Sequence, residues 1–314
     1  MNATTTDAAR GRRAWPRSGS RRRAVARYLP LYLSISPFYI LFAIFGLFPI
    51  AFSLYLSLQK WDGIGAMTYV GLSQYRFLVT DPFFWQSIVN TLEIWVLSTI
   101  PMLFLALVIA FLLNSSLRFK GFYRVAYFLP NVTSIVAIAI IFGSLFGNSF
   151  GLLNALLTAV KLPAVAWLTS EWGIKVAIAA MVVWQWTGYN AIIYLAGLQS
   201  IPTDLYEAAR VDGANTRQIF FRIMIPLLQP VILFTVITST IGGMQIFAQP
   251  QVLVGNTGGP GNAGLTMVLY LYQQAFSHNL FGYGAAIGWG LFVIIVLFSA
   301  LNWRIVQRPG AGLR

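Results

Sequence analysis

Cysteine is absent from the 314 residues of this chain, and histidine occurs once, at His278. The absence of cysteine excludes disulfide bonds and thiolate chemistry, and a single histidine leaves no histidine cluster for a metal ion. The sequence also contains no GxxxxGK[ST] pattern, so we expect no P-loop for ATP, and it offers no Ser–His–Asp arrangement for nucleophilic catalysis. The chain is therefore predicted to hold no metal or cofactor of its own and not to be an enzyme by itself.

Charged residues are scarce as well: they make up 9% of the chain, whereas roughly 25% is usual in a soluble domain. Apolar residues make up 58%, and the mean hydropathy is +0.71. A helix needs about 20 mainly apolar residues to cross a bilayer. Six stretches reach that length, over residues 29–58, 86–113, 125–146, 174–198, 228–254 and 281–303. The sequence therefore predicts an all-α integral membrane protein with six transmembrane helices.

The basic residues are distributed unevenly among the segments that connect the expected spans. Seventeen of the 21 lysines and arginines fall in residues 1–27 and 304–314 and in the loops 114–124 and 199–230, with eight arginines in residues 1–27 alone. Because loops rich in lysine and arginine stay on the cytoplasmic side, we expect both termini and the 199–230 loop in the cytoplasm. Residues 1–27 are predicted to form a disordered basic tail, 28–307 the six-helix domain, and 308–314 a second cytoplasmic tail.

The formal net charge of +13 follows from this same asymmetry and from the arginine-rich tail. The tail has neither a helical pattern nor interleaved aromatic residues, so we do not expect it to bind nucleic acid. We expect it to be attracted to anionic lipid headgroups instead. Membrane lipid is thus a predicted partner of this chain, and nucleic acid is not.

Residues 199–230 form a polar, charged segment between two long apolar runs that carry no charge. Its first half has the composition of a helix that ends at Gly213, which can take the left-handed conformation common after helices. Asn215 can then cap a second helix whose apolar residues recur at helical spacing. We expect Pro226 and Pro230 to end that second helix and to lead into the next span. The segment is therefore predicted to be a helix–turn–helix on the membrane surface.

The order Glu207-Ala208-Ala209, Gly213 and Ile225-Pro226 in this segment resembles the EAA loop of the membrane subunits of binding-protein-dependent ABC importers. That family usually has leucine where this chain has Ile225. In the family, the loop is a pair of coupling helices that dock into a cleft of the partner ATPase; the alternative is a helix that only covers headgroups. The resemblance implies that the ATPase-coupling residues are Glu207, Ala208, Ala209, Asp212, Gly213 and Pro226.

The resemblance extends from about residue 30 to residue 307. Several short motifs occur in the order found in the sugar-importing branch, among them Asp81-Pro82, Leu129-Pro130 opening the third span, Gly151-Leu152-Leu153-Asn154 and Gly258-Gly259-Pro260. Each motif is weak alone, but together they are similar to the first permease of maltose, lactose and glycerol-phosphate importers. The resemblance implies the permease fold of type I ABC importers.

This resemblance also implies partners and a mechanism. The partners are a second permease of the same family, an ABC ATPase homodimer or pair that binds ATP and magnesium, an extracytoplasmic solute-binding protein, and a sugar, expected to be a di- or oligosaccharide. Transport across the bacterial cytoplasmic membrane is expected to proceed by alternating access. Glu207 would pair with a basic group of the ATPase, Ala208 and Ala209 would allow close approach, and Gly213 would supply the bend. Arg210 and Asp212 either make rim contacts or are solvated.

Candidate sugar-contacting residues lie in the fourth and fifth expected spans, the regions from which the family draws its substrate pocket. Sugars are held by hydrogen bonds to amides and by stacking of their C–H faces on aromatic rings. The amide and aromatic residues placed there are Gln185, Trp186, Tyr189, Asn190, Gln245 and Gln249. The alternative for each of them is interhelical hydrogen bonding and packing.

Glu93 is an ionisable residue well inside an expected span, and such residues are functional candidates. A protonated or paired structural carboxyl group is the alternative. A stand-alone secondary transporter or channel is the competing interpretation of the whole chain; it would need an inverted repeat or a coupling-ion site and no ATPase-docking loop. We find no internal repeat and too few carboxylates within the spans for a proton relay, so the importer subunit is favoured.

Overall fold

The computed structural model describes residues 19–114 and 118–306, which are mainly helical. The chain divides into two compact units, residues 1–53 and 54–314, and this division falls within the segment 28–307 that the sequence groups as one domain. Most of the predicted basic tail and the whole of the tail predicted over 308–314 lie outside the described residues.

The first unit is one long run of helix. α1 (Gly19–Phe42) leads through a π-helical turn (Ala43–Leu47) into the first part of α2 (Phe48–Leu56). From Tyr28 onward its apolar side chains are mostly exposed, as in a helix that faces lipid. The helix begins at Gly19, within residues 1–27, the segment that the sequence predicts to be a disordered tail. Arginine and alanine, which dominate residues 20–27, are strong helix formers.

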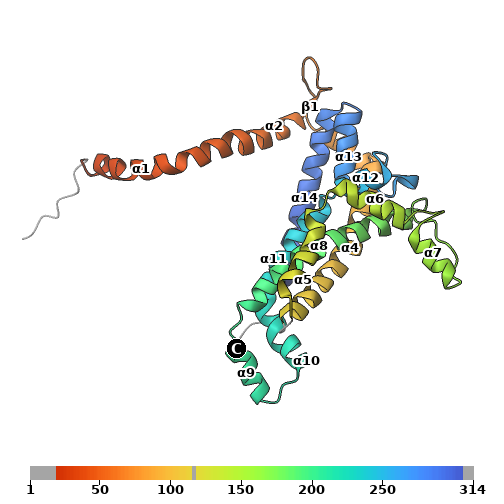
Figure 1. Ribbon diagram of the computed structural model, residues 1–314. Coiled ribbons are helices and arrows are strands. Elements are labelled where there is room, and N and C mark those ends of the chain that lie inside the picture. The colour runs from red at the N-terminus through yellow and green to blue at the C-terminus, as the bar shows by residue number, and fades with distance from the viewer. Residues whose placement is uncertain (1–18, 115–117, 307–314) are drawn as a thin grey trace, which may run out of the picture. The chain divides into compact units, whose positions relative to one another are not determined.

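Four long helices form the frame of the second unit (Figure 1). They are α4 (Pro82–Asn114), α8 (Glu171–Gln199), α11 (Ile225–Met244) and α14 (Phe281–Val306). α4 packs along α8, and α11 packs against α4, α8 and α14. Among the described residues, five helices are long and apolar enough to cross a membrane, and a bent pair brings the number to six. The all-α, multi-span architecture predicted from the sequence is confirmed.

The bent pair replaces the continuous helix predicted over 125–146. α5 (Lys120–Val132) and α6 (Ile135–Leu145) meet at an angle of 94°. Pro130 lies near the end of α5 and has no N–H to donate to the preceding turn, and Thr133 then takes an extended conformation. The Leu129-Pro130 motif predicts that Pro130 opens the third span. In the structure Pro130 instead helps to end α5.

The fifth span begins earlier than the prediction, because its prolines do not end the preceding helix. α9 (Thr203–Val211) is followed by α10 (Thr216–Ile219), which continues through a π-helical turn (Phe220–Met224) directly into α11. In this wider turn the N–H of Ile225 donates to the carbonyl of Phe220, five residues back. Pro226 follows this wider turn directly, and the helix continues past it into α11.

The same span also ends earlier than predicted. α11 stops at Met244, and a short helix, α12 (Ala248–Val254), follows after a break at residues 245–247. Two glycines precede the break, and glycine is a weak helix former. The segment predicted as one span over 228–254 is therefore two helices, and its polar residues lie at the junction between them.

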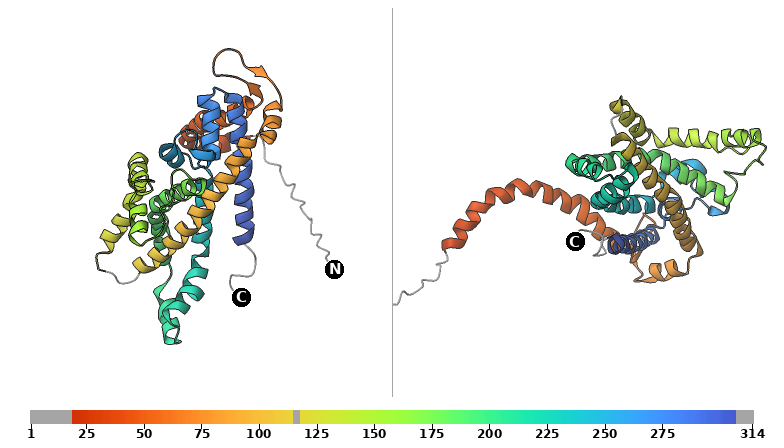
Figure 2. Two further views of the ribbon diagram at one scale, coloured as in Figure 1. Left: turned by 90° about the vertical axis from the view of Figure 1, so that its right-hand side faces the viewer. Right: turned by 90° about the horizontal axis from the view of Figure 1, so that it is seen from below.

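Shorter elements complete the second unit. They are the antiparallel pair β1 (Gln59–Lys60) and β2 (Thr68–Tyr69), α3 (Ser73–Thr80), α7 (Leu152–Ala159), a 3-10 turn (Pro260–Asn262), α13 (Met267–Tyr272) and a π-helical turn (Gln273–Ser277). The β1–β2 hairpin and α13 lie at one end of the unit, and α9 and α10 protrude from the other end (Figures 1 and 2).

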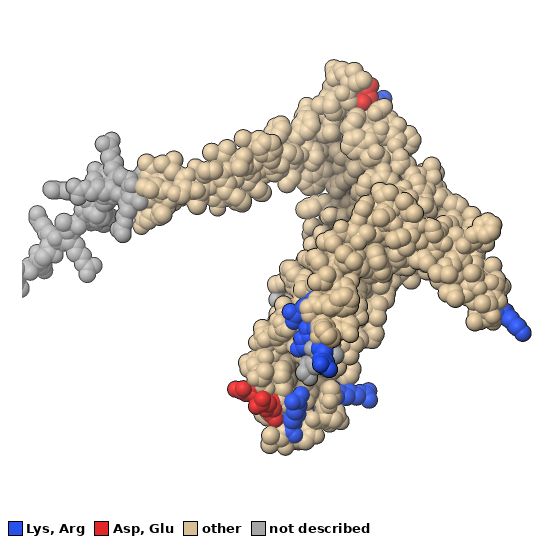
Figure 3. All heavy atoms as spheres, in the orientation of Figure 1, with Lys and Arg blue, Asp and Glu red and all other residues tan. Residues whose placement is uncertain are grey.

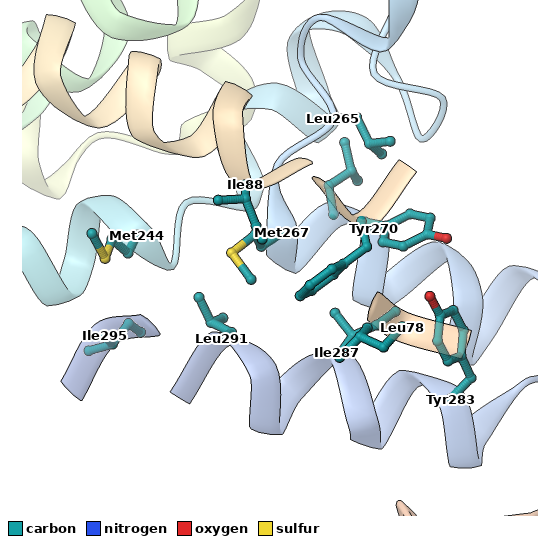
Figure 4. Packing of buried hydrophobic residues seen from close by; sticks show 12 residues of the cluster. Leu78, Ile88, Met244, Leu265, Met267, Tyr270, Tyr283, Ile287, Leu291 and Ile295 are labelled. Atoms are coloured by element: carbon teal, nitrogen blue, oxygen red, sulfur yellow. The ribbon is translucent and has the colours of Figure 1, made fainter. Parts of the chain in front are cut away.

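The end of the unit that carries α13 has a buried apolar core (Figure 4). Side chains from α3, α4, α13 and α14 meet there, including Leu78, Met267 and Leu291. Beside them the buried carboxylate of Asp81 accepts hydrogen bonds from the hydroxyls of Tyr270 and Tyr283. Asp81 also accepts from the N–H of Phe83 at 2.9 Å and so caps the start of α4. One carboxylate thus joins three helices.

Candidate functional site

A cavity of about 460 Å³ lies between α4, α8 and the junction of α11 with α12. This volume falls within the ≈ 300–1,000 Å³ usual for small-molecule sites. Its lining consists of Thr99, Met102, Val182, Trp186, Tyr189, Asn190, Thr238, Ser239, Gly242, Gly243, Gln245, Ile246, Phe247, Ala248 and Gln249. None of these lining residues is Asp, Glu, Lys, Arg or His, so the polarity of the cavity comes from amides, hydroxyls and backbone groups.

Amide side chains from two helices meet at this cavity. The Nε2 of Gln249, on α12, donates to the Oε1 of Gln185, on α8, at 3.0 Å. Asn190 lies five residues further along α8 and is buried, and its Nδ2 donates to the carbonyl of Trp186 at 3.1 Å. These amides retain further donors and acceptors that a bound hydroxyl group could use.

Two aromatic rings on α8 line the same cavity. Trp186 and Tyr189 lie with their ring centroids 5.7 Å apart and their planes at 86°. Both are partly open, with 38% and 41% of their surface exposed. The two rings therefore offer faces of different orientation next to the amides, an arrangement suited to stacking against the C–H faces of a sugar.

The break between α11 and α12 brings the second amide to the site. The carbonyl of Ile246, within the break, accepts a hydrogen bond from the Oγ1 of Thr266 at 2.7 Å, which fixes the chain where it leaves α11. At the end of α11, a Cβ on Gly243 would lie 2.6 Å from Trp95, so glycine there permits the close approach of α11 to α4. Without the break, a continuous helix would carry Gln249 further along the axis of α11.

The structure therefore brings together all six residues that the sequence proposes for the substrate pathway. Trp186, Tyr189, Asn190, Gln245 and Gln249 line the cavity, and Gln185 is hydrogen-bonded to one of them. Sequence reasoning missed the contribution of α4, represented by Thr99 and Met102. Both lie in an apolar span whose composition gives no signal for them.

Glu93 does not line the cavity; it forms an ion pair with Lys175. The pair joins α4 to α8, and the side chain of Lys175 is only 10% exposed. The Nζ of Lys175 also lies 5.5 Å from the ring centroid of Trp172. Of the two alternatives for Glu93, the paired structural carboxylate is the one found.

The turn of the 199–230 loop has the geometry that its glycine predicts. Gly213 has φ +81°, and its N–H donates to the carbonyl of Arg210 at 3.0 Å. The N–H of Ala214 reaches back to the carbonyl of Ala209 at 2.9 Å. These two bonds form a complete Schellman motif, which closes the end of α9.

The second helix of the loop begins with a capping box, as predicted for Asn215. The Oδ1 of Asn215 accepts from the N–H of Gln218 at 2.9 Å, and the Oε1 of Gln218 accepts from the N–H of Asn215 at 2.8 Å. Both ends of the turn are thus held by local hydrogen bonds, and the helix–turn–helix prediction is confirmed.

The proposed coupling residues do not all face the same way. Glu207, Ala208, Asp212, Gly213 and Pro226 are exposed. Ala209 is half-buried and packs, together with Tyr206, against a core formed by the ends of α4, α8 and α11. Burial raises the pKa of the Tyr206 hydroxyl. Ala209 therefore packs the loop against the helix ends, whereas the other coupling candidates lie on the open surface of the loop.

Two apolar residues on this open surface were missed by the sequence reasoning. Val211 is 88% exposed and Leu205 is 44% exposed, both on α9. Their spacing from Ala208 is three residues on either side, so the three side chains share one face of the helix. A helical-face analysis of α9 could have found this stripe, which borders Glu207.

Comparison with known proteins identifies the family of this chain. Residues 94–309 match the model of the family described as binding-protein-dependent transport system inner membrane component. The match covers more than half of the chain. The chain belongs to this family. It is therefore a multi-pass membrane permease, a transport subunit and not an enzyme by itself, as the sequence predicts.

Relatives of the permease with assigned roles are similar over almost its whole length. The lactose transport system permease protein LacF of Rhizobium radiobacter is 38% identical over 288 residues, which are 90% of this chain and 96% of that protein. The arabinooligosaccharides transport system permease protein AraP of Bacillus subtilis (strain 168) is 38% identical over 276 residues, 87% of each chain.

The fold of the permease is also found in a solved structure. One chain in the crystal structure of a bacterial alginate ABC transporter, in complex with alginate pentasaccharide-bound periplasmic protein, superposes with a TM-score of 0.77. The superposition covers 91% of the permease and 96% of that chain at 22% sequence identity. The likeness confirms the predicted fold of an ABC importer permease.

Proposed function

We propose that this permease carries a di- or oligosaccharide across the cytoplasmic membrane by alternating access, as one membrane subunit of an ABC importer. The observation that supports a saccharide most directly is the cavity between α4, α8 and the α11–α12 break, where amides and aromatic rings meet without an ionisable acid or base. The roles of the two relatives, lactose transport and arabinooligosaccharide transport, support the same class of cargo.

In this proposal the sugar is held by the amides of Gln185, Asn190 and Gln249 and packs on Trp186 and Tyr189. Gln245 is exposed at the end of α11 and would meet the sugar at the mouth of the cavity. The existing bond between Gln249 and Gln185 keeps both amides in position before the sugar arrives. Such preorganisation lowers the entropic cost of binding.

The proposed assembly contains a second permease of the same family, a pair of ABC ATPases that bind ATP and magnesium, and an extracytoplasmic solute-binding protein. The open face of α9, with Glu207 and Ala208, would dock into the ATPase, and Asp212 would lie at the edge of that contact. Leu205 and Val211 would supply the apolar part of the interface. The ATPases close when they bind ATP, and the rigid turn at Gly213 would transmit that movement to α11.

The proposed orientation places both termini and the α9–α10 loop in the cytoplasm, where ATP is available. It is supported by the gathering of basic side chains at the end of the second unit that carries α9 and α10 (Figure 3). Loops rich in arginine and lysine stay cytoplasmic. The segment 28–307 would act as the permease domain.

Uptake of labelled di- and oligosaccharides by vesicles containing the complete transporter tests this proposal. Gln249→Ala removes one sugar-facing amide and leaves Gln185 unpaired, which costs about 1–3 kcal/mol and should slow transport roughly ten- to hundred-fold. The matched control is Gln251→Ala, two residues further along α12, whose side chain bonds to Asn256 outside the cavity.

Sugar-independent ATPase activity should be unchanged in both variants, because the coupling loop is untouched. Equal uptake by the two variants would place the sugar elsewhere, for example mainly on the second permease. Absence of ATP-dependent uptake for every saccharide offered would contradict the proposed cargo itself.

A further inference from the structure

An apolar groove of about 680 Å³ lies on another side of α8, away from the amide-lined cavity. Three helices form the groove, and the side chains that line it are apolar except for Tyr127, Trp184 and Thr187. The residues that line it are Leu97, Leu105 and Ile109 from α4, Ala126, Tyr127 and Pro130 from α5, and Val176, Ala179, Ala180, Val183, Trp184, Thr187 and Gly188 from α8. The hydroxyl of Thr187 is already bonded to the carbonyl of Val183 at 2.5 Å.

The groove results from the bend in the third span. α5 packs so tightly on α8 that a Cβ on Gly188 would lie 1.7 Å from the carbonyl oxygen of Tyr127. After Val132 the chain turns by 94° into α6 and leaves the neighbouring faces of α4 and α8 uncovered. The groove therefore lies between α4, α5 and α8.

Basic residues stand at the α5 end of the groove. Arg124 lies one turn before Tyr127 on the same face of α5, and Lys120 precedes it by four residues, so the two cations are neighbours. The Nε of Arg124 is buried and has no hydrogen-bond partner among the described residues. A buried guanidinium nitrogen without a partner is costly, and an anion at this position would satisfy it.

We propose that the groove binds one acyl chain of an anionic phospholipid, whose phosphate is held by Arg124 and Lys120. From Leu97 to Ile109 the groove extends twelve residues along α4, or ~18 Å at the rise of an α-helix. This matches the ~15 Å thickness of one leaflet of the hydrocarbon core. The apolar wall and the basic end thus occur in the order and at the distance in which a phospholipid carries its chain and its phosphate. This site is separate from the proposed transport of a sugar.

The lipid would fill the space left by the bend and would hold α5 against α8. Basic pockets between membrane helices are known to hold anionic headgroups in this way. The lipid is therefore a structural ligand of the third span, and the side chains that bind it differ from those that line the amide cavity.

Native mass spectrometry of the full-length permease in detergent, with phosphatidylglycerol or phosphatidylcholine added, tests the proposal. We expect a one-lipid adduct with phosphatidylglycerol that is much weaker with phosphatidylcholine. Arg124→Ala should lower its occupancy about fivefold, the factor that corresponds to about 1 kcal/mol for one basic contact. The control Arg222→Ala removes an exposed arginine of the loop and should leave the adduct unchanged.

A second pair of variants tests the apolar wall independently. Ala126→Phe fills the groove and should abolish the adduct, whereas Val125→Phe changes the neighbouring exposed residue, which does not line the groove, and should preserve it. Equal binding of both lipids, equal effects of Arg124→Ala and Arg222→Ala, or equal effects of the two phenylalanine variants would each overturn the proposal.

A last measurement looks for the lipid adduct on the assembled transporter. The adduct should persist when the permease is purified with its partner subunits. If the adduct disappears on assembly and Ala126→Phe weakens the association of the two permeases, the groove is a contact between subunits and the lipid site is refuted. Uptake of sugar is not a readout here, so this test does not depend on the proposed cargo.

Discussion

At the scale of single residues, Glu93 and Lys175 show how this permease accommodates charge within its apolar helices. They lie 82 positions apart in the sequence but form an ion pair between α4 and α8. The side chain of Lys175 is 10% exposed and that of Glu93 is 32% exposed. An ammonium group at such a site is costly unless it is paired, and the ring of Trp172 adds a second favourable contact. The pair therefore stabilises the packing of α4 on α8.

Glu93→Gln should destabilise the permease by removing the counter-ion of Lys175. We expect a loss of about 1–3 kcal/mol, below the 3–5 typical of a fully buried pair, because Glu93 keeps part of its surface exposed. Thermal unfolding of the detergent-purified protein measures it. The control Glu207→Gln neutralises an exposed carboxylate of the coupling loop and should leave the unfolding temperature unchanged.

Exchanging the charges of Glu93 and Lys175 tests whether the loss of stability comes from the broken ion pair. The double variant with Glu93→Lys and Lys175→Glu restores an ion pair in the opposite direction and should recover most of the lost stability. If Glu93→Gln unfolds at the wild-type temperature, the pair does not contribute to the stability of the helix packing.

At the scale of elements, the contacts of α8 determine where the amide-lined cavity and the apolar groove lie. One face of α8 meets α4 and α12 around the amide-lined cavity, and another meets α5 beneath the apolar groove. Gly188 brings the backbones of α5 and α8 into contact, while the 94° bend after α5 keeps the rest of the third span away. Small residues at such crossings are typical of helix packing in membranes.

Gly188→Ala should force α5 away from α8. The added Cβ would meet backbone atoms that cannot rotate away, so we expect a destabilisation of at least about 1–3 kcal/mol. The control Gly143→Ala places the same methyl group on α6, where no atom lies within 4 Å, and should be neutral or stabilising. Thermal unfolding of the two variants in one detergent compares them, and equal unfolding temperatures would contradict the close contact.

Gly213→Val should uncouple the two helices of the loop. A β-branched residue at φ +81° is strained by more than about 1 kcal/mol, so the turn between α9 and α10 would shift. Sugar uptake by the complete transporter should fall strongly, while the amount of protein in the membrane and sugar binding by the solute-binding protein stay normal.

The matched control for this variant is Gly65→Val. Gly65 has a similar φ of +79° in the β1–β2 hairpin, with no atom within 4 Å of an added Cβ. Gly65→Val imposes a similar backbone strain far from the α9–α10 loop and should leave sugar uptake largely intact. Normal transport by Gly213→Val at wild-type protein level would count against the proposed coupling geometry.

At the scale of the whole molecule, the uneven distribution of charge determines the proposed orientation. The β1–β2 hairpin and the α9–α10 loop lie at opposite ends of the second unit (Figure 1). The chain has no cysteine, so one cysteine introduced at either end is a unique label. Ile64 in the hairpin is 85% exposed and Val211 in the loop is 88% exposed, which makes both accessible to a reagent.

In spheroplasts that express the permease without its ATPase partners, Ile64→Cys should react with a membrane-impermeant maleimide while the cells are intact, whereas Val211→Cys should react only after permeabilisation. The physical reason is the retention of arginine-rich loops in the cytoplasm. The cysteine-free permease is the control for background labelling. Labelling of Val211→Cys from outside would reverse the proposed orientation and remove the loop from any ATPase.

The sequence by itself determined the features that depend on local chemistry. Runs of apolar residues are sufficient to predict membrane spans, because each span must satisfy its own backbone hydrogen bonds in lipid. The helix–turn–helix of the loop follows from Gly213 and Asn215, since a left-handed glycine and an N-cap act on their immediate neighbours. The motifs that carry the family resemblance are also short and local, so their order along the chain was sufficient to predict the fold.

Only the tertiary structure decided which residues from different helices meet. The bond between Gln249 and Gln185, the ion pair of Glu93, and the inward position of Ala209 join positions that have no local signal. The breaks at residues 133–134 and 245–247 depend on packing as well, because proline and glycine permit an interruption but do not require one. A π-helical turn carries the chain past Pro226 without a break. Non-local contacts select among the conformations that each segment can adopt, and so they, and not composition, placed the cavity.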